Sequence, residues 1–126
     1  MYNILVCDDE KDIVTALEIY LRNDDYKIFK AYNGADALKI LTEEEIHLVL
    51  LDIMMPKMDG HQAAKAIRAM YADRPDAEEI PIIALSANAF SEDVQASLDA
   101  GMNGHVSKPL NMEEVTKVIE RNLNRP

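Results

Sequence analysis

The stretch from His47 to Asp52 reads HLVLLD, an apolar run that ends in a single carboxylate. Apolar side chains at consecutive positions put hydrophobic groups on both faces of a strand, as in the centre of a parallel sheet that is covered by helices on both sides. A second run of this kind extends from Asn3 to Cys7, and it is followed by Asp8 and Asp9. These two segments predict buried strands of one α/β domain.

The flanking sequence alternates between short apolar runs and amphipathic stretches. Strands are expected at residues 3–7, 28–31, 47–51, 81–85 and 105–107, and helices at residues 13–21, 34–44, 63–70, 90–98 and 112–123. Five β-α units with right-handed crossovers favour a flavodoxin-like (βα)5 three-layer sandwich, with a five-stranded parallel sheet in the order 2-1-3-4-5. Residues 1–126 are expected to form a single domain.

The composition is that of a globular protein and argues against several other classes. Hydrophobic residues make up 48% of the 126 residues, and charged residues make up 29%. No apolar run approaches the roughly 20 residues of a membrane-spanning helix, and the start of the chain lacks the basic region of a signal peptide. The net charge of −10, from 23 acidic residues against 13 Lys and Arg, argues against direct binding to nucleic acid.

The cysteine content bears on the location of the protein. Cys7 is the single cysteine of the sequence, so an internal disulfide is excluded. It lies inside a strand pattern and is interpreted as a core residue rather than a nucleophile. A reducing cytoplasm is therefore the expected location.

Polar side chains follow the expected strands at the edge where open parallel sheets bind their ligands. Asp8 and Asp9 follow the first strand and Asp52 the third, while Ser86 ends the fourth and Lys108 the fifth. Three carboxylates in one place repel one another unless a cation offsets them. Mg²⁺ prefers hard oxygen ligands, including phosphate oxygens. The pattern predicts a metal-assisted site for a phosphoryl group.

Each of these residues also has a simpler interpretation when it is taken alone. Asp8 or Asp9 could cap the first helix, and Asp52 could be an ordinary strand-end aspartate that opens a turn. Ser86 could be a turn hydroxyl, and Lys108 could be a solvated loop lysine. The coincidence of complementary groups at four strand ends favours the joint interpretation.

Five motifs, in order along essentially the whole chain, resemble the response regulator receiver domain of two-component signalling. They are Asp8-Asp9, residues 51–56 (LDIMMP), Asp59-Gly60, residues 84–87 (ALSA) and Lys108-Pro109. Residues 86–90 and 101–105 are most similar to receivers fused to hybrid histidine kinases. Residues 4–21 are more similar to receivers of DNA-binding regulators, so the parent architecture stays open.

The resemblance implies a role for each matching residue. Asp52 would be the phosphoacceptor, Lys108 would contact a phosphoryl oxygen, and Ser86 would bond another oxygen after phosphorylation. A cis peptide bond before Pro109 would aim the lysine into the site. Mg²⁺, with Mn²⁺ as a substitute, would be held by three carboxylates and one backbone carbonyl, those of Asp8, Asp9, Asp52 and Met54.

The resemblance also implies a function and partners. The domain would take a phosphoryl group from a phosphohistidine of a sensor histidine kinase or a histidine phosphotransfer protein. It would be a signalling switch that assists its own phosphorylation and dephosphorylation, not an enzyme. The switching face would be the fourth helix, fifth strand and fifth helix, with Ser86 and His105 as switch residues; the family often has Tyr or Phe at the position of His105. An output domain, fused or separate, and a phosphorylation-linked dimer both stay open.

Three other functions fit the sequence less well. A flavin-binding electron carrier would need a phosphate-binding turn rich in glycine and hydroxyl groups after the first strand, where this chain has three acids. A phosphatase with an aspartyl nucleophile would have a second Asp two residues after Asp52, where Met54 stands. An inert receiver-like interaction domain would be expected to have lost Asp52 or Lys108.

Overall fold

The computed structural model describes residues 2–22, 25–52, 80–86, 102–107 and 110–123. The strands and helices in these ranges follow in the order β1 (Tyr2–Cys7), α1 (Lys11–Leu21), β2 (Tyr26–Ala31), α2 (Gly34–Glu43), β3 (Leu48–Asp52), β4 (Ile82–Ser86), β5 (Gly104–Ser107) and α5 (Met112–Leu123). The helices expected at residues 63–70 and 90–98 lie outside the described residues.

The five strands form one sheet in the order β2-β1-β3-β4-β5, and every neighbouring pair runs parallel. This confirms the flavodoxin-like α/β fold expected from the alternating pattern. The central strand, β3, is buried along its whole length. Its unbroken apolar run therefore forms the buried central strand that the sequence predicted.

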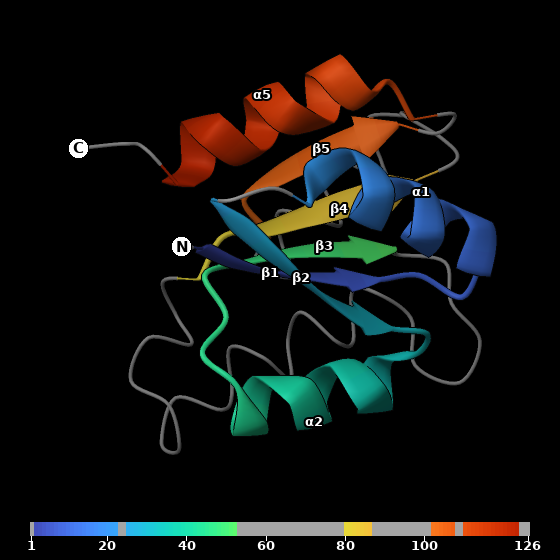
Figure 1. Ribbon diagram of the computed structural model, residues 1–126, viewed down its shortest axis with the longest axis vertical. Helices are drawn as coiled ribbons and strands as arrows, with labels where there is room; N and C mark the ends of the chain where they lie inside the picture. The colour runs from blue at the N-terminus through green and yellow to red at the C-terminus, as the bar shows by residue number, and fades with distance from the viewer. Residues whose placement is uncertain (1, 23–24, 53–79, 87–101, 108–109, 124–126) are drawn as a thin grey trace.

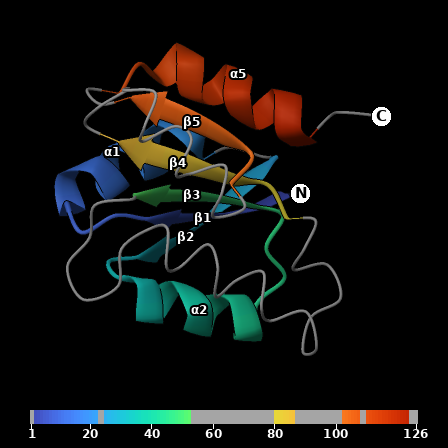
Figure 2. The same cartoon turned by 180° about the vertical axis from the view of Figure 1, so that it is seen from behind.

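The sheet lies between two layers of helix, with α1 and α5 on one face and α2 on the other (Figures 1 and 2). Side chains alternate between the two faces along β1: Ile4 and Val6 pack with α1 and α5, whereas Leu5 and Cys7 pack with α2. Burying each large aliphatic side chain of these two clusters contributes about 1.5–3 kcal/mol.

The observed strand ends differ slightly from those expected. β3 includes Asp52, which pairs with Leu85 of β4, so this carboxylate belongs to the ladder itself. Pro81 lies before β4, because a proline has no N–H to give to the ladder. The carbonyl of Pro81 nevertheless accepts a hydrogen bond from Val49 N–H at 2.9 Å.

Asparagine side chains cap the first turns of α2 and α5. Asn33 Oδ1 accepts the N–H of Asp36 at 2.8 Å and caps α2. Asn111 Oδ1 does the same for α5, accepting from the N–H groups of Glu113 at 3.0 Å and Glu114 at 3.2 Å. The three described helices have 11, 10 and 12 residues. No helix in the described part of the chain is both long and apolar enough to cross a membrane.

Candidate functional site

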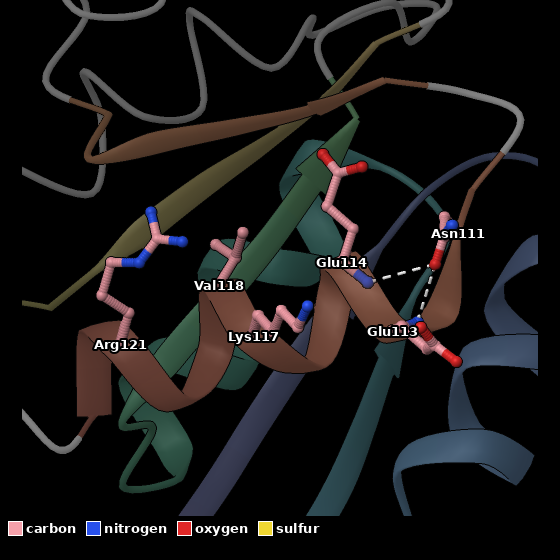
Figure 3. A pocket seen from close by; sticks show the side chains of 6 residues that line it. All are labelled: Asn111, Glu113, Glu114, Lys117, Val118 and Arg121. Atoms are coloured by element: carbon pink, nitrogen blue, oxygen red, sulfur yellow. Dashed lines mark hydrogen bonds between the residues drawn. The ribbon is translucent and has the colours of Figure 1, made fainter.

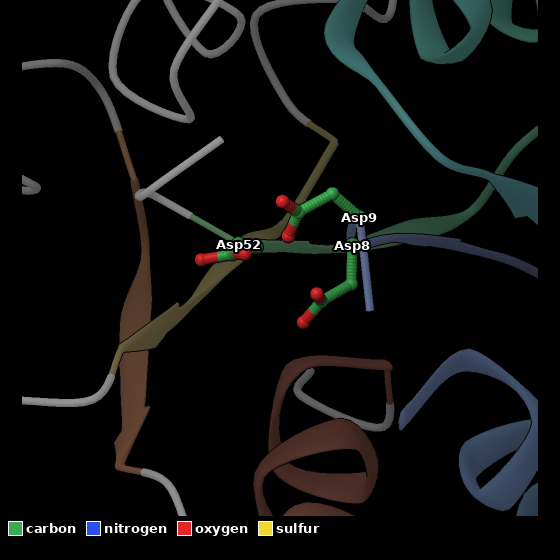
Figure 4. Close-up of side chains that lie close together, drawn as sticks. All are labelled: Asp8, Asp9 and Asp52. Carbon is green, nitrogen blue, oxygen red and sulfur yellow. The ribbon is translucent and has the colours of Figure 1, made fainter. Parts of the chain in front are cut away.

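Three carboxylates meet at the carboxyl ends of the two central strands (Figure 4). Asp8, Asp9 and Asp52 each offer one oxygen, and these three oxygens all lie within 4.8 Å of one another. The register explains the meeting, because Cys7 pairs with Leu51 across β1 and β3, and the next residue in each chain segment is an aspartate. The sheet therefore brings together three of the residues that the sequence predicted for the site.

The three aspartates differ in their exposure to solvent. Asp8 is fully buried and Asp52 is 3% exposed, whereas Asp9 is exposed. Two unit charges 4.8 Å apart repel by roughly 3 kcal/mol in a medium of effective dielectric constant about 20. Buried carboxylates at this spacing are costly, and such a cost is typical of functional sites rather than of packing.

Two backbone contacts hold Asp8 in place. Its N–H donates to the carbonyl of Ala31 at 3.2 Å, which ties it to the end of β2. Its Oδ1 accepts the N–H of Glu10 at 2.9 Å. Glu10 occupies the N-cap position of α1, and no side-chain hydrogen bond from that position closes the first turn. Asp8 therefore lies two residues before the N-cap position, and its carboxylate bonds the N–H of the N-cap residue.

The donor set of this cluster fits a divalent cation. All three side chains offer hard carboxylate oxygens, which are the ligands that Mg²⁺ selects, and the exposed Asp9 leaves one side open to water and to a phosphate oxygen. A cation would also offset the mutual repulsion of the cluster. Asp8, Asp9 and Asp52 are the described residues that could hold the metal.

Cys7 lies directly before the cluster and is fully buried. Its Sγ donates a hydrogen bond to the carbonyl of Asn33 at 3.3 Å. Burial raises the pKa of this thiol from 9.0 to about 12, and the negative charges of Asp8 and Asp52 add to the effect. The thiol therefore stays protonated, in agreement with its interpretation as a core residue.

The Cys7 thiol is expected to resist alkylation in the folded protein at pH 8 and to react fully in urea, which mass spectrometry after iodoacetamide treatment would detect. Its folded-state pKa is raised, so its contribution to stability is complete below about pH 9 and is lost as the pH rises toward 12. In Cys7→Ala, the free energy of unfolding should fall less steeply over that interval. Rapid labelling of the native protein, or equal slopes, would contradict this account.

The remaining predicted site residues are placed less completely. Ser86 ends β4 and pairs with Ser107 of β5, and His105 pairs with Ala84. His105 Nε2 is buried and has no hydrogen-bond partner among the described residues. The structure does not describe the predicted positions Met54, Lys108 and Pro109.

One residue near the site, Asn33, has roles that none of the sequence motifs above predicted. Asn33 both caps α2 and accepts the Cys7 hydrogen bond, so it fixes the loop beside the acidic cluster. An Asn three residues before an Asp at the start of an amphipathic stretch is a capping signal that could have indicated the first of these roles.

A shallow pocket of about 290 Å³ lies along α5, apart from the carboxylates (Figure 3). Its lining is formed by Asn111, Glu113, Glu114, Lys117, Val118 and Arg121. Charges of both signs share this surface, and none of the predicted site residues contributes to it.

Comparison with solved structures gives relatives of the same fold over nearly the whole chain. A putative response regulator from Chloroflexus aurantiacus is 26% identical with a TM-score of 0.89, and the match covers 98% of each chain. The receiver domain of a sensor histidine kinase from Pseudomonas aeruginosa, with a magnesium ion coordinated in its active-site cleft, is 30% identical with a TM-score of 0.86 and 98% coverage of both chains.

A third structure contains a partner protein. The receiver domain of the Saccharomyces cerevisiae response regulator Ssk1, in a co-crystal structure with the histidine phosphotransfer signaling protein Ypd1, is 27% identical with a TM-score of 0.88. That match covers 97% of this chain and 88% of the other. The family model of the response regulator receiver domain matches residues 4–120. With this match over the strands that carry the three aspartates, the chain belongs to the response regulator receiver domain family of two-component and phosphorelay signalling.

Proposed function

We propose that Asp52 accepts a phosphoryl group from a phosphohistidine on a partner protein. The observation that carries this proposal is the carboxylate cluster, which puts Asp52 at the end of the central strand within 4.8 Å of Asp8 and Asp9. In the transfer, an Asp52 carboxylate oxygen forms a bond to phosphorus while the phosphorus–nitrogen bond breaks. The imidazole leaves with the electron pair and remains on the partner.

Two negatively charged groups must approach each other for this reaction, so charge compensation and positioning supply most of the catalysis. Bound Mg²⁺ would neutralise the phosphoryl oxygens and the acceptor carboxylate together. Asp8 and Asp9 support this proposal as carboxylates that could hold the ion beside Asp52. The backbone carbonyl of Met54 and the ammonium group of Lys108 take the complementary roles that the family resemblance implies.

The partner in this proposal is a sensor histidine kinase or a histidine phosphotransfer protein. The Ssk1 receiver in complex with Ypd1 supports this choice. The domain itself acts as a switch and not as a turnover enzyme, because the phosphoryl group stays on its own carboxylate until water removes it. We place this switch in the cytoplasm, where the lone thiol of Cys7 would remain reduced.

The test of the proposed function is incubation with a small-molecule phosphodonor and Mg²⁺. Intact-mass measurement should find one added phosphoryl group, absent when EDTA replaces the metal, and peptide mapping should place it on Asp52. Two added groups, or a group mapped to Ser86, would overturn the assignment of the acceptor.

The switch is proposed to act through the ends of β4 and β5, where Ser86 and Ser107 are paired. By the family resemblance, the Ser86 hydroxyl would form a charge-assisted hydrogen bond to a phosphoryl group on Asp52, and this bond would bias a two-state element that includes β5. Ser86→Ala should still be phosphorylated but should lose the NMR shift changes of His105 and Val106 on adding a phosphoryl mimic.

His105→Ala should be phosphorylated at the wild-type rate, and its main effect should be on partner binding. Unmoved β5 resonances in the wild type would refute the switch.

A further inference from the structure

A side-chain bridge joins the amino ends of β1 and β3, at the sheet edge opposite the carboxylates. The N–H of Asn3 donates to His47 Nδ1 at 2.9 Å, and the N–H of His47 donates back to the carbonyl of Asn3 at 2.8 Å. The side-chain amide of Asn3 also donates to the carbonyl of Glu45 at 2.6 Å. Asn3 is thereby held by a segment more than 40 residues away in the sequence.

The hydrogen bond from Asn3 determines which tautomer the neutral His47 ring adopts. A backbone N–H can donate to Nδ1 only if that nitrogen carries a lone pair, so the neutral ring has its proton on Nε2. Nε2 lies 3.3 Å from Glu45 Oε1. In the doubly protonated ring, an Nδ1 proton would face the Asn3 N–H, and the bridge would break.

The surroundings of the ring allow solvent protons to reach it. The His47 side chain is 31% exposed, and the nearby Glu45 side chain is 76% exposed. The Tyr2 ring packs edge-on against the imidazole at 5.6 Å between centroids, and beyond it Tyr26 of β2 lies 6.3 Å from Tyr2.

Among the described residues, Glu45 is therefore the charged group that faces the ring, and Tyr2 is the titratable group that packs edge-on against it. Asp25 lies beyond Tyr2, and its carbonyl accepts the N–H of Tyr2 at 2.7 Å. On the β4 side, the carbonyl of Pro81 accepts the N–H of Val49, and proline carries no charge. The Glu45 carboxylate favours the charged ring, but at this exposure its attraction is largely screened. The lost Asn3 hydrogen bond opposes the charged ring without such screening.

We propose that His47 is a pH-sensitive latch on the start of β1. The neutral ring closes the latch by accepting the Asn3 N–H, and protonation opens it. Imidazole is the side chain that ordinarily changes charge between about pH 5 and pH 8. Opening is confined to Tyr2 and Asn3, because the following residues Ile4 to Cys7 pair with both β2 and β3 and are buried. The latch does not depend on the proposed phosphoryl transfer.

Hydrogen exchange of the Asn3 amide tests the latch. Its protection factor, corrected for intrinsic exchange, should fall roughly fivefold between pH 8 and pH 5, which corresponds to one ordinary hydrogen bond. The Val49 amide, which is bonded to Pro81, should stay constant and serves as the internal reference. At pH 8, the ¹⁵N shifts of the His47 ring should report a proton on Nε2.

Three variants separate His47 from other titrating groups. His47→Gln keeps an acceptor oxygen without a titration, so Asn3 protection should lose its pH dependence. His47→Phe keeps a ring against Tyr2 without an acceptor, so protection should be low at both pH values. Glu45→Gln should retain the pH step. Equal Asn3 protection at pH 5 and pH 8 in the wild type, a proton on Nδ1 at pH 8, or the same step in His47→Gln would each overturn the latch.

Discussion

Replacing Asp52 with asparagine is expected to abolish phosphorylation of the domain while leaving its fold intact. The amide has nearly the same shape as the carboxylate and can keep its place beside Leu85 at the end of the β3–β4 ladder. Its oxygen carries no negative charge to attack phosphorus, and the variant also removes one of the three clustered charges. With a phosphodonor and Mg²⁺, the added mass of one phosphoryl group should disappear, a loss of at least roughly a thousandfold in rate.

A matched control shows whether this loss is specific to the acceptor. Asp12 is an exposed acid in the first turn of α1, so Asp12→Asn changes the net charge by the same amount outside the cluster. It should be phosphorylated at the wild-type rate. If Asp52→Asn is still modified to one group per chain, another residue is the acceptor and the proposed function is wrong.

The sequence predicted the fold well because the decisive signals are local. An apolar run on both faces identifies a central strand, and the run from Leu48 to Leu51 is buried in full. Alternation of strands with amphipathic helices leaves few topologies, and the strand order 2-1-3-4-5 is confirmed. Asp8, Asp9 and Asp52 could be grouped from sequence alone, because the carboxyl ends of parallel strands share one edge.

The features that were not predicted depend on contacts between distant segments. Nothing local indicates that the ring of His47 accepts the N–H of Asn3, because that contact is set by the register of two strands 44 residues apart. The hydrogen bond from Cys7 to the Asn33 carbonyl spans 26 residues and depends on how the loop after β2 turns. The different burial of Asp8 and Asp9 likewise follows from the direction in which the chain leaves β1 toward α1.

Asp8→Asn is expected to separate metal binding from stability by moving them in opposite directions. Asp8 is fully buried, and one of its oxygens lies within 4.8 Å of oxygens of Asp9 and Asp52. Asparagine keeps an Oδ1 that can accept the N–H of Glu10, so the local structure should persist. It removes a buried charge and two repulsions, and the metal-free protein should gain about 1–3 kcal/mol in the free energy of unfolding at pH 7.

Adding Mg²⁺ should stabilise the wild type more than Asp8→Asn. In the wild type, Mg²⁺ at a hundred times its dissociation constant should add about 2.7 kcal/mol to the free energy of unfolding, because a ligand that binds only the native state stabilises it. In Asp8→Asn, the same concentration should add almost nothing, since a carboxylate of the cluster has been lost. Urea denaturation measures this effect. In EDTA, Asp8→Asn should be more stable than the wild type; in Mg²⁺, the wild type should equal or exceed the variant. Asp12→Asn should differ from the wild type by less than about 0.5 kcal/mol in both conditions.

The contradicting result would be a metal-free Asp8→Asn that is less stable than the wild type. It would mean that other groups of the folded protein compensate the charge of Asp8. The cluster would then not be a site whose repulsion a cation relieves.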